Sequence, residues 1–546
     1  MIVVEAVAKI LKKEGIEFVT CFPSNDLLEA VAQEDIRTIM FRHERGAVMA
    51  ADGFSRMKGR NNFGVVITQG TSGAENAMGG IAQAFADNVP ILYLTDGPLL
   101  SQYGVNPYFS PVRTYESVSR HAELISHPDQ VSDVMRRAFH ALRNGTPGPV
   151  IVEIPKDVGE SNMPSDDIEY SIPTRTLQLP EQDKINKAVK ILLEAKRPVI
   201  WSGMGVLFSR ATVQLQELAE LLQIPVFCTM PGKSSFNENH PLSLGSGSAA
   251  TTLPAKKWLK DSDVLFAIGS SLTKTLYGQQ IPAGKKIIHS VESISNINKD
   301  FPAEVGLPGD AKLILEAILK EVKTQLKVNN DINTGISDEI ALLKEKWMSE
   351  WQPILESDET PINTYRVIHA MNLAIDKDNS TITHDAGAPR DTIMPFYIAT
   401  VPHSYVGWGK STHLGYGIPL MIGAKIANPN RFCMNFMGDG AFGMSGLDIE
   451  TSVREKIPIT TLVLNNGGMA TYPGGYPAAK EKFGTTFLTG DYAKIAEGLG
   501  AIGIVVKDPN ELIPAIKKAQ ELNASGKTVL IDVHSNLEGR RSFPEV

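Results

Sequence analysis

Residues 431–466 read RFCMNFMGDGAFGMSGLDIETSVREKIPITTLVLNN. The apolar run from Phe432 to Met437 predicts a buried strand, and Gly438-Asp439-Gly440 predicts a turn at its end. A helix is expected next, followed by a second strand from Ile459 to Leu464 that ends at Asn465-Asn466. The stretch therefore predicts a βαβ unit with polar groups at the carboxyl ends of both strands, where open parallel sheets bind ligands.

The polar residues of this unit suit a diphosphate and a divalent cation. Gly438 and Gly440 let the backbone turn tightly and approach a ligand closely. The N–H groups of Gly440 and Ala441, at the start of the predicted helix, favour an anion. Asp439 and Asn466 offer hard oxygen donors of the kind that Mg²⁺ prefers. A Gly-Asp-Gly turn alone is common, but 24 residues separate this one from Asn-Asn, at two predicted strand ends, which favours the functional interpretation.

Length and composition exclude several classes of protein. A chain of 546 residues predicts two to four domains, because single cores rarely grow past about 300 residues. A net charge of −8 argues against nucleic acid or an anionic membrane as the main partner. The chain has no basic leader and no apolar run long enough to span a membrane, and its three cysteines form no CxxC pair. We expect a cytoplasmic protein without a disulfide framework.

Short apolar runs alternate with amphipathic helical patterns in three successive segments. Continuous apolar strands in such an alternation are typical of parallel sheets covered on both faces. We predict an α/β protein with three doubly wound parallel-sheet domains, at residues 1–165, 184–325 and 355–546. A polar, proline-containing stretch from about 159 to 183 predicts a linker. The clearest strand signals are Val65–Ile67, Ile91–Leu94, Val150–Ile154, Pro198–Trp201, Pro225–Cys228, Val264–Ile268, Lys286–Ser290, Thr381–Thr383 and Val529–Val533.

The spacing of Gly-Asp-Gly and Asn-Asn resembles the signature of thiamine-diphosphate-dependent enzymes. The similarity covers nearly the whole chain, as a pyrimidine-binding, a middle and a diphosphate-binding domain, and it is strongest to the acetolactate synthase-like group of 2-oxo-acid enzymes. The resemblance implies thiamine diphosphate and Mg²⁺ as cofactors. It also implies that the metal is bound by Asp439, Asn466 and the main-chain carbonyl of Gly468.

Arg42-His-Glu44-Arg45 resembles the segment that carries the family's activating glutamate. The resemblance makes Glu44 the acid that shares a proton with the aminopyrimidine ring of the cofactor. A strand end followed by a helix places Glu44 at the rim of the first sheet, and a desolvating pocket would raise its pKa. The alternative is a solvated glutamate at a helix start, paired with Arg42 or Arg45.

Further cofactor contacts are implied by the resemblance. Gly70 and Asn76 belong to a glycine-rich turn that approaches the pyrimidine, although an ordinary helix start with Ser72 as N-cap is equally compatible with this pattern. By the resemblance, Leu414 bends the cofactor, with ordinary core packing as the alternative for this residue. The Thr412 carbonyl would accept a hydrogen bond from the amino group of the cofactor. The remaining predicted contacts are His413, Gly387 and Ala388 in one loop, and Gly468 and Met469 in another. The loop containing Gly387 departs from the acetolactate synthase pattern, which has Gln-His after the glycine.

The substrate side departs from the acetolactate synthase pattern. Phe109 is kept, Ser110 stands where glutamine is expected, and Arg120 takes the position of a lysine, followed by His121. An arginine holds a carboxylate in bidentate fashion, so these changes shift substrate preference in an unknown direction. We take all four as catalytic candidates, with a packed or solvated histidine as the alternative for His121. Residues 467–477 predict a lid, in which Met469 and Tyr472 line the pocket or simply pack within the loop.

The predicted function is C–C bond cleavage or formation on a small 2-oxo acid or related carbonyl compound by an acetolactate synthase-like carboligase or lyase. The alternatives are a decarboxylase or C–C hydrolase of another donor, such as an acyl-CoA or a diketone, and a non-catalytic cofactor-binding relative. FAD is doubtful, because the middle domain lacks the family's Arg-Phe-Asp-Asp-Arg run and has only a short Gly203-Met-Gly205 loop. Because family members assemble each site from two subunits, we expect a homodimer or homotetramer.

Overall fold

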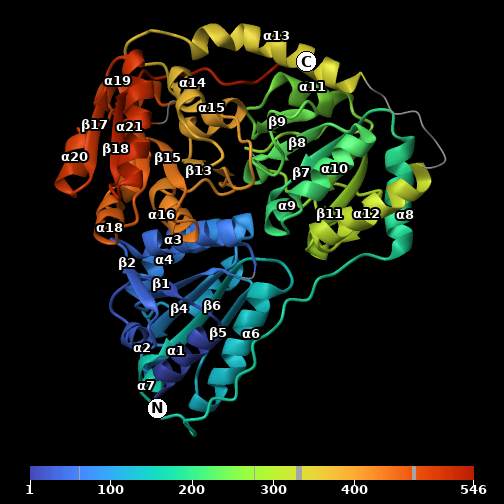
Figure 1. The fold of residues 1–546 in the computed structure, drawn as a ribbon. Coiled ribbons are helices and arrows are strands. Elements are labelled where there is room, and N and C mark those ends of the chain that lie inside the picture. Colours follow the sequence, from blue (N-terminus) through green and yellow to red (C-terminus); the bar gives the residue numbers. More distant parts are fainter. Residues whose placement is uncertain (61, 276, 327–334, 470–474) are drawn as a thin grey trace. The chain divides into compact units, whose positions relative to one another are not determined.

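The computed structural model describes residues 1–60, 62–275, 277–326, 335–469 and 475–546, and within them the chain forms three six-stranded parallel sheets flanked by helices (Figure 1). The α/β prediction is confirmed. The first sheet has the order β2-β1-β3-β4-β6-β5, the second β12-β11-β10-β7-β8-β9 and the third β14-β13-β15-β16-β18-β17. Each order reverses near the middle of the sheet, as in doubly wound folds.

The strand bounds follow in chain order. The first sheet consists of β1 Phe18–Phe22, β2 Arg37–Met40, β3 Gly64–Thr68, β4 Ile91–Gly97, β5 His121–Leu124 and β6 Pro149–Pro155. The second consists of β7 Pro198–Ser202, β8 Val226–Thr229, β9 Ser243–Gly247, β10 Val264–Ile268, β11 Lys286–Val291 and β12 Val305–Pro308. The third consists of β13 Ser380–His384, β14 Tyr405–Val406, β15 Phe432–Gly438, β16 Thr460–Asn465, β17 Ile502–Val506 and β18 Val529–His534.

The helices alternate with these strands. Around the first sheet they are α1 Val3–Lys13, α2 Leu27–Gln33, α3 Glu44–Lys58, α4 Ser72–Asp87, α5 Pro111–Tyr115, α6 Val131–Arg143 and α7 Lys156–Gly159. Next come α8 Gln182–Glu194, α9 Met204–Phe208, α10 Thr212–Leu222, α11 Leu253–Asp261, α12 Ala311–Leu326 and α13 Ile336–Leu355. The last are α14 Thr364–Ala374, α15 Ala388–Phe396, α16 Gly417–Ala427, α17 Asp439–Ser445, α18 Asp448–Arg454, α19 Pro477–Phe483, α20 Tyr492–Gly498 and α21 Leu512–Ala524.

The chain divides into two compact units. Unit 1 consists of residues 1–176, 409–430 and 445–459, and unit 2 consists of 177–408, 431–444 and 460–546. Each predicted domain contains one sheet, but two segments of the third predicted domain, with helices α16 and α18, belong to unit 1. The three boundaries drawn from the sequence therefore stay predictions.

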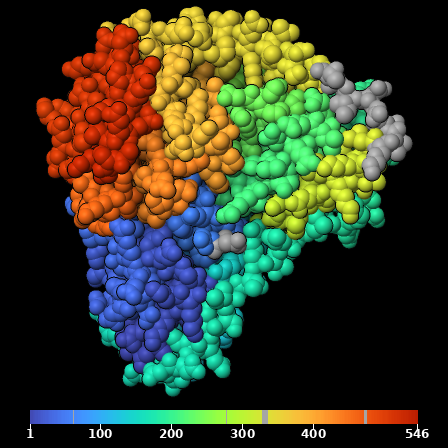
Figure 2. Space-filling model, in the orientation of Figure 1, coloured from blue at the N-terminus to red at the C-terminus, as the bar shows by residue number. Residues whose placement is uncertain are grey.

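Helices α3 and α16 pack closely within unit 1. A Cβ atom added to Gly53 of α3 would lie 2.2 Å from the Leu420 carbonyl oxygen, and one added to Gly423 of α16 would lie 1.9 Å from the Ala50 carbonyl oxygen. In the space-filling view, orange residues meet blue ones where these two helices lie together (Figure 2). Glycines on both helices let the two backbones touch.

The structure corrects the predicted turn and helix after β15. The strand continues through Gly438, and α17 begins directly at Asp439, so no separate turn exists there. The single expected helix is two short ones, α17 and α18. The reason is the Ser445-Gly-Leu447 sequence, which contains a glycine and allows the chain to turn between them.

Among the residues that the structure describes, no helix is both long and apolar enough to cross a membrane. The three cysteines, Cys21, Cys228 and Cys433, are all free and buried.

Candidate cofactor site

Three loops of unit 2 follow adjacent strands at the carboxyl edge of the third sheet. Strand β15 pairs with β13 on one side and with β16 on the other. The ends of these strands and the segments that follow contain Gly387, Gly438 and Asn466, three of the residues predicted to bind the cofactor or its metal. A Cβ atom on Gly438 would lie 3.7 Å from Cγ of Pro389, so the first two loops are neighbours. The sheet therefore brings the predicted diphosphate residues to one edge.

Asp439 is held at the start of α17 by backbone donors. Its two carboxylate oxygens accept hydrogen bonds from the N–H groups of Gly440 and Gly467, each at 2.8 Å. The side chain is buried, and this burial raises its pKa above the ordinary value although the backbone N–H groups oppose the shift. A carboxylate oxygen has two lone-pair directions, so both oxygens keep room for a further partner.

The two asparagines after β16 have different surroundings. The Asn465 amide donates to Oδ1 of Asp532 at 3.0 Å and to the Gly490 carbonyl at 3.2 Å, so it supports the loop. The Asn466 side-chain oxygen accepts from the Gly468 N–H at 3.0 Å. This contact folds the loop so that Asn466 and Gly468, two of the three residues implied as metal ligands, lie in one tight turn.

The donor set fits the implied cation and diphosphate. In the described parts of the chain, no group of three or more His, Cys, Asp or Glu side chains is arranged to hold a metal. A cation at Asp439 would therefore share one carboxylate, one amide oxygen and a main-chain carbonyl with phosphate oxygens, a combination typical of Mg²⁺. A Cβ atom on Gly440 would lie 2.8 Å from Cγ of Met469, so a larger residue there would displace the Met469 side chain.

Gly387 and Ala388 form the start of α15. Gly387 is the N-cap residue with φ +82°, a conformation that favours glycine, and Ala388 is the first helical residue. Pro389 follows and has no N–H, so the helix start offers only backbone donors from its neighbours.

Met469 donates its N–H to the Thr486 carbonyl at 2.8 Å, while Tyr472 lies outside the described residues.

In unit 1, Glu44 begins α3 directly after β2, at the carboxyl edge of the first sheet. The residue is 5% exposed, and its Oε2 accepts a hydrogen bond from the side-chain amide of Asn76 at 3.1 Å. A Cβ atom on Gly73 would lie 3.4 Å from the other carboxylate oxygen. Arg42 does not supply the ion pair of the alternative interpretation, because its guanidinium lies 3.8 Å from the Glu450 carboxylate. Nδ1 of His43 lies 3.8 Å from the Glu44 carboxylate.

Gly70 lies in a tight turn before α4. Its N–H donates to the Asp96 carboxylate, and a Cβ atom there would lie 2.2 Å from the Asp96 carbonyl oxygen. The helix starts at Ser72, and its N-cap residue is Thr71, which makes no side-chain cap hydrogen bond. The ordinary N-cap expected of Ser72 is therefore not present. Instead, the turn brings α4 and Asn76 to Glu44.

The segment containing Thr412, His413 and Leu414 belongs to unit 1 and contacts α4. The Gln83 side-chain oxygen accepts from the His413 N–H at 3.3 Å. Burial and the nearby Arg45 lower the pKa of His413. Leu414 is half-buried.

Phe109 and Ser110 lie in the loop after β4, at the same edge of the sheet as Glu44. The Phe109 ring packs edge-on against Tyr115, whose hydroxyl donates to the Ala74 carbonyl of α4. The Ser110 hydroxyl lies 3.1 Å from the Tyr103 hydroxyl. The loop is thus connected to the helix that contacts Glu44.

Arg120 and His121 lie elsewhere. His121 is the first residue of β5, so both side chains lie at the amino edge of the sheet, opposite Glu44, and β5 and β2 are the two outermost strands. Arg120 donates to Pro147 O at 2.9 Å and to Asn88 Oδ1 at 2.6 Å, and His121 lies 2.7 Å from Glu123. The structure does not bring these two candidates to Glu44, because parallel strands start and end at opposite edges.

Sequence reasoning missed three buried polar residues near these segments: Gln83, Asp87 and Glu153. Glu153 lies in β6, and its Oε2 accepts from the Tyr103 hydroxyl at 3.1 Å. Only the spacing of Asn76, Gln83 and Asp87 along one predicted helix offered a signal in the sequence.

Comparisons with known proteins agree with this arrangement. Three family models match: the "Thiamine pyrophosphate enzyme, N-terminal TPP binding domain" at residues 1–117, the "central domain" at 185–318 and the "C-terminal TPP binding domain" at 385–533. Thiamine pyrophosphate is another name for thiamine diphosphate.

Whole-chain relatives are similar over nearly their full length. The chain is 32% identical to the probable acetolactate synthase large subunit of Methanococcus aeolicus, over 94% of this chain and 89% of that protein. It is 30% identical to the protein of the same description from Methanocaldococcus jannaschii, with the same coverage. It is 26% identical to acetolactate synthase isozyme 3 large subunit of Escherichia coli, over 97% of this chain and 94% of that protein.

These matches confirm the resemblance inferred from Gly-Asp-Gly and Asn-Asn. The three matched regions contain the three sheets, with Glu44 in the first region and Asp439 and Asn466 in the third. The chain belongs to the thiamine pyrophosphate enzyme family, in its acetolactate synthase-like group, and is a thiamine-diphosphate-dependent enzyme.

Proposed function

We propose that the chain is a carboligase that cleaves a small 2-oxo acid and transfers the remaining fragment to a second carbonyl compound, as an acetolactate synthase does. One observation carries the proposal: the residues that would hold and activate the cofactor are all present in a chain that is similar to acetolactate synthase subunits over most of its length. Glu44 is buried beside Asn76, and Asp439 lies beside Asn466, in a chain of which 94% is similar to a probable acetolactate synthase large subunit.

Each candidate residue has a stated role in this proposal. Asp439, Asn466 and the Gly468 carbonyl would hold Mg²⁺, and the N–H group of Ala441 at the start of α17 would face the diphosphate, since the N–H group of Gly440 already donates to Asp439. Thiamine diphosphate, when bound, supplies the electron sink for cleavage beside the carbonyl group. Glu44 would exchange a proton with the aminopyrimidine ring, for which its buried, hydrogen-bonded carboxylate is suited.

The substrate would lie near Phe109 and Ser110. Both are in the loop after β4, which packs on α4 through Tyr115. A serine offers a shorter hydrogen-bonding group than the glutamine of the family pattern, which leaves more room for the acceptor. Arg120 and His121 are not included in the proposal, because β5 begins at His121 and the amino ends of parallel strands lie opposite the edge that carries Glu44.

Three finer assignments complete the proposal: a homodimer or homotetramer, a cytoplasmic location and a middle domain without FAD. The last is supported by close backbone packing, since a Cβ atom on Gly205 would lie 2.6 Å from Cα of Gly269. The glycines of that loop are therefore explained by contact between two loops, without a nucleotide. An absorbance scan of the purified protein in the flavin region tests this assignment.

The reaction is tested with a panel of 2-oxo acids, thiamine diphosphate and Mg²⁺. With pyruvate, the expected products are acetolactate and CO₂, one of each from two pyruvate molecules. An aldehyde would indicate a simple decarboxylase instead, and hydrolysis of a diketone or of an acyl-CoA would indicate the other alternative. Cofactor binding without turnover of any donor would refute the proposal in favour of a non-catalytic relative.

A further inference from the structure

One face of helix α4 carries polar side chains along most of its length. Asn76, Gln83 and Asp87 are spaced by seven and four residues, which places them on the same side of the helix. Gln83 and Asp87 are buried at 0% and 2% exposure. Buried polar groups are normally hydrogen-bonded, and the partners here lie in the segment 409–413.

The carboxyl-terminal part of α4 holds the backbone of this segment. Asp87 accepts hydrogen bonds from the N–H groups of Gly409 at 2.9 Å and Lys410 at 3.1 Å. Gln83 Oε1 accepts from the Ser411 hydroxyl at 2.8 Å and from the His413 N–H at 3.3 Å. Four of five consecutive residues are therefore attached to two side chains of one helix.

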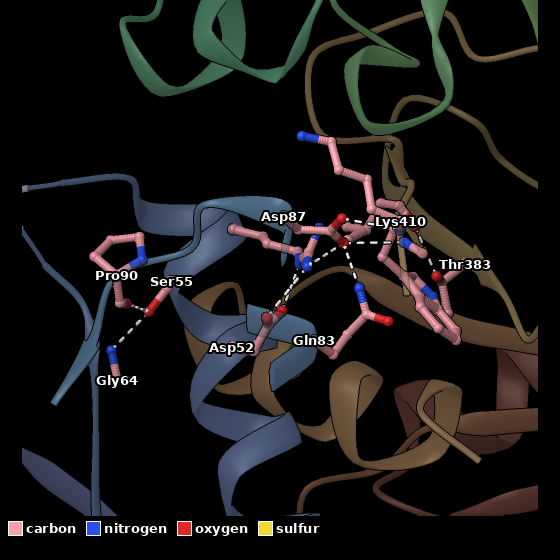
Figure 3. A network of polar contacts seen from close by, with 12 residues as sticks. Asp52, Ser55, Gly64, Gln83, Asp87, Pro90, Thr383 and Lys410 are labelled. Atoms are coloured by element: carbon pink, nitrogen blue, oxygen red, sulfur yellow. Dashed lines mark hydrogen bonds and ion pairs between the residues drawn. The ribbon is translucent and has the colours of Figure 1, made fainter. Parts of the chain in front are cut away.

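Arg56 of α3 holds Asp87, and Asp87 holds Gln83. Its guanidinium donates to Asp87 at 2.9 Å and to both carboxylate oxygens of Asp52, and Gln83 Nε2 donates to Asp87 at 2.8 Å. Figure 3 shows Asp52 and Asp87 directed toward the same group from opposite sides. Burial alone would raise the pKa of Asp87, but Arg56, Lys410 and the two backbone N–H groups lower it below its ordinary value, so Asp87 is ionised.

The one residue of the segment that is not attached in this way, Thr412, has a strained backbone. Its φ is +56°, a conformation that is unfavourable for a β-branched residue. Such a conformation persists only where the surroundings hold the chain on both sides. Here Ser411 precedes it and His413 follows it, and both are bonded to Gln83.

The helix backbone also supports the His413 ring. A Cβ atom on Gly79, between Asn76 and Gln83 on α4, would lie 2.2 Å from Nε2 of His413. The imidazole therefore lies directly on the helix, and a larger residue at position 79 would displace the ring.

We propose that Gln83 and Asp87, supported by Arg56, are positioning residues that hold Thr412 to Leu414 in the conformation that receives the cofactor. Through Asn76 and Gln83, helix α4 then sets both Glu44 and the Thr412 carbonyl from a single rigid element. The inference rests on the proposed function in one respect, that Thr412 to Leu414 contact the cofactor. It adds the residues that determine where this segment lies.

The test is a double-mutant cycle on thiamine diphosphate affinity, measured by calorimetric titration in the presence of Mg²⁺. Gln83→Leu removes the bonds to Ser411 and His413 and should weaken cofactor binding about tenfold. Glycine adopts a positive φ without strain, so Thr412→Gly should need less support from Gln83. The double variant should therefore bind within about threefold of Thr412→Gly alone, which means that the two effects are not additive.

Two further variants separate positioning from folding. Gly79→Ala favours the helix but displaces the His413 ring, so it should weaken cofactor binding without lowering the melting temperature. Glu75→Gln, at an exposed site of the same helix, is the matched control and should leave affinity unchanged.

Wild-type affinity in Gly79→Ala, or additive effects in the cycle, would overturn the inference. If Gln83→Leu does not fold, the cofactor affinity of Gly79→Ala by itself tests the inference. Because no substrate is present in these titrations, a wild-type chain that binds the cofactor but makes no acetolactate refutes only the proposed function.

Discussion

The side-chain amide of Asn76 donates a hydrogen bond to the buried carboxylate of Glu44 over 3.1 Å. This contact joins the starts of two helices, α3 and α4, that follow different strands of the first sheet. It holds Glu44 in place while leaving one carboxylate oxygen for a ligand.

Replacing Glu44 by glutamine should separate cofactor binding from turnover. The amide keeps the shape of the side chain and still accepts from Asn76, but it cannot take up a proton. We expect thiamine diphosphate affinity within about threefold of wild type and product formation reduced at least about hundredfold. Titration and steady-state product assays measure the two quantities. Turnover near the wild-type rate in Glu44→Gln would remove Glu44 from the mechanism.

Replacing Asp439 by asparagine should weaken binding of the cofactor together with Mg²⁺. The negative charge is lost, and the NH₂ group that replaces one carboxylate oxygen cannot accept the hydrogen bond that this oxygen receives from Gly440 or Gly467. We expect Mg²⁺-dependent affinity to fall by about 10- to 100-fold or more. Asp358→Asn, at an exposed position, is the control. If the two variants bind the cofactor equally well at all Mg²⁺ concentrations, the metal site lies elsewhere.

Glu153 should make stability fall as the pH rises. Burial raises its pKa from 4.5 to about 7, and among the described residues no donor reaches its Oε1. The folded state therefore binds this proton more tightly than the unfolded state does, so the stabilisation is present at low pH. This stabilisation is lost as the pH rises from the pKa of Glu153 in the unfolded state through its pKa in the folded state. The total loss in the free energy of unfolding is roughly 3 kcal/mol.

Glu153→Gln removes this titration. We expect the variant to melt at a higher temperature than wild type at about pH 8.5, with a smaller difference at about pH 5.5, in scanning calorimetry. Glu169→Gln, at an exposed site, should follow wild type at both values. A difference that is the same at both pH values would contradict the assignment.

The contact between α3 and α16 should not tolerate alanine. In Gly423→Ala the new methyl group would lie 1.9 Å from a main-chain oxygen of α3, which cannot rotate away. We expect a loss of stability of about 3 kcal/mol, at the upper end for overpacking. Gly498→Ala, in α20 with no atom within 4 Å of the added Cβ, should instead stabilise the chain by about 0.5–1 kcal/mol. Thermal melts that rank the two variants in the opposite order would refute this contact.

Long apolar strands were readable from the sequence, whereas short and edge strands were not. The runs at Val150–Ile154 and Val264–Ile268 lie within β6 and β10, because strands buried on both faces are continuously apolar. The edge strand β5 reads His-Ala-Glu-Leu and is only half-buried, and β14 has two residues. The alternation of β5 extends over four residues only and β14 is shorter still, so neither run can be told from a loop in the sequence.

The same difference applies to the site. Glu44, Asp439 and Asn466 lie in local motifs, in which the spacing of a few residues indicates the chemistry. Arg120 and His121 were chosen by position along the chain, and the sheet places them at its opposite edge. Glu153 was missed because nothing in a linear pattern distinguishes a buried polar residue from a solvated one, and the only signal for Gln83 was its spacing from Asn76 and Asp87 along one helix.

The sequence by itself determined the three α/β segments, the cofactor class and the glycine, acid and amide residues at the strand ends, because each depends on neighbours within about 30 residues of chain. Only the tertiary structure decided that residues 409–413 attach to α4, more than 300 positions earlier, and that Glu44 lies beside Asn76. Burial and hydrogen bonding between distant segments arise when the sheets and helices pack, and chain order does not encode them locally.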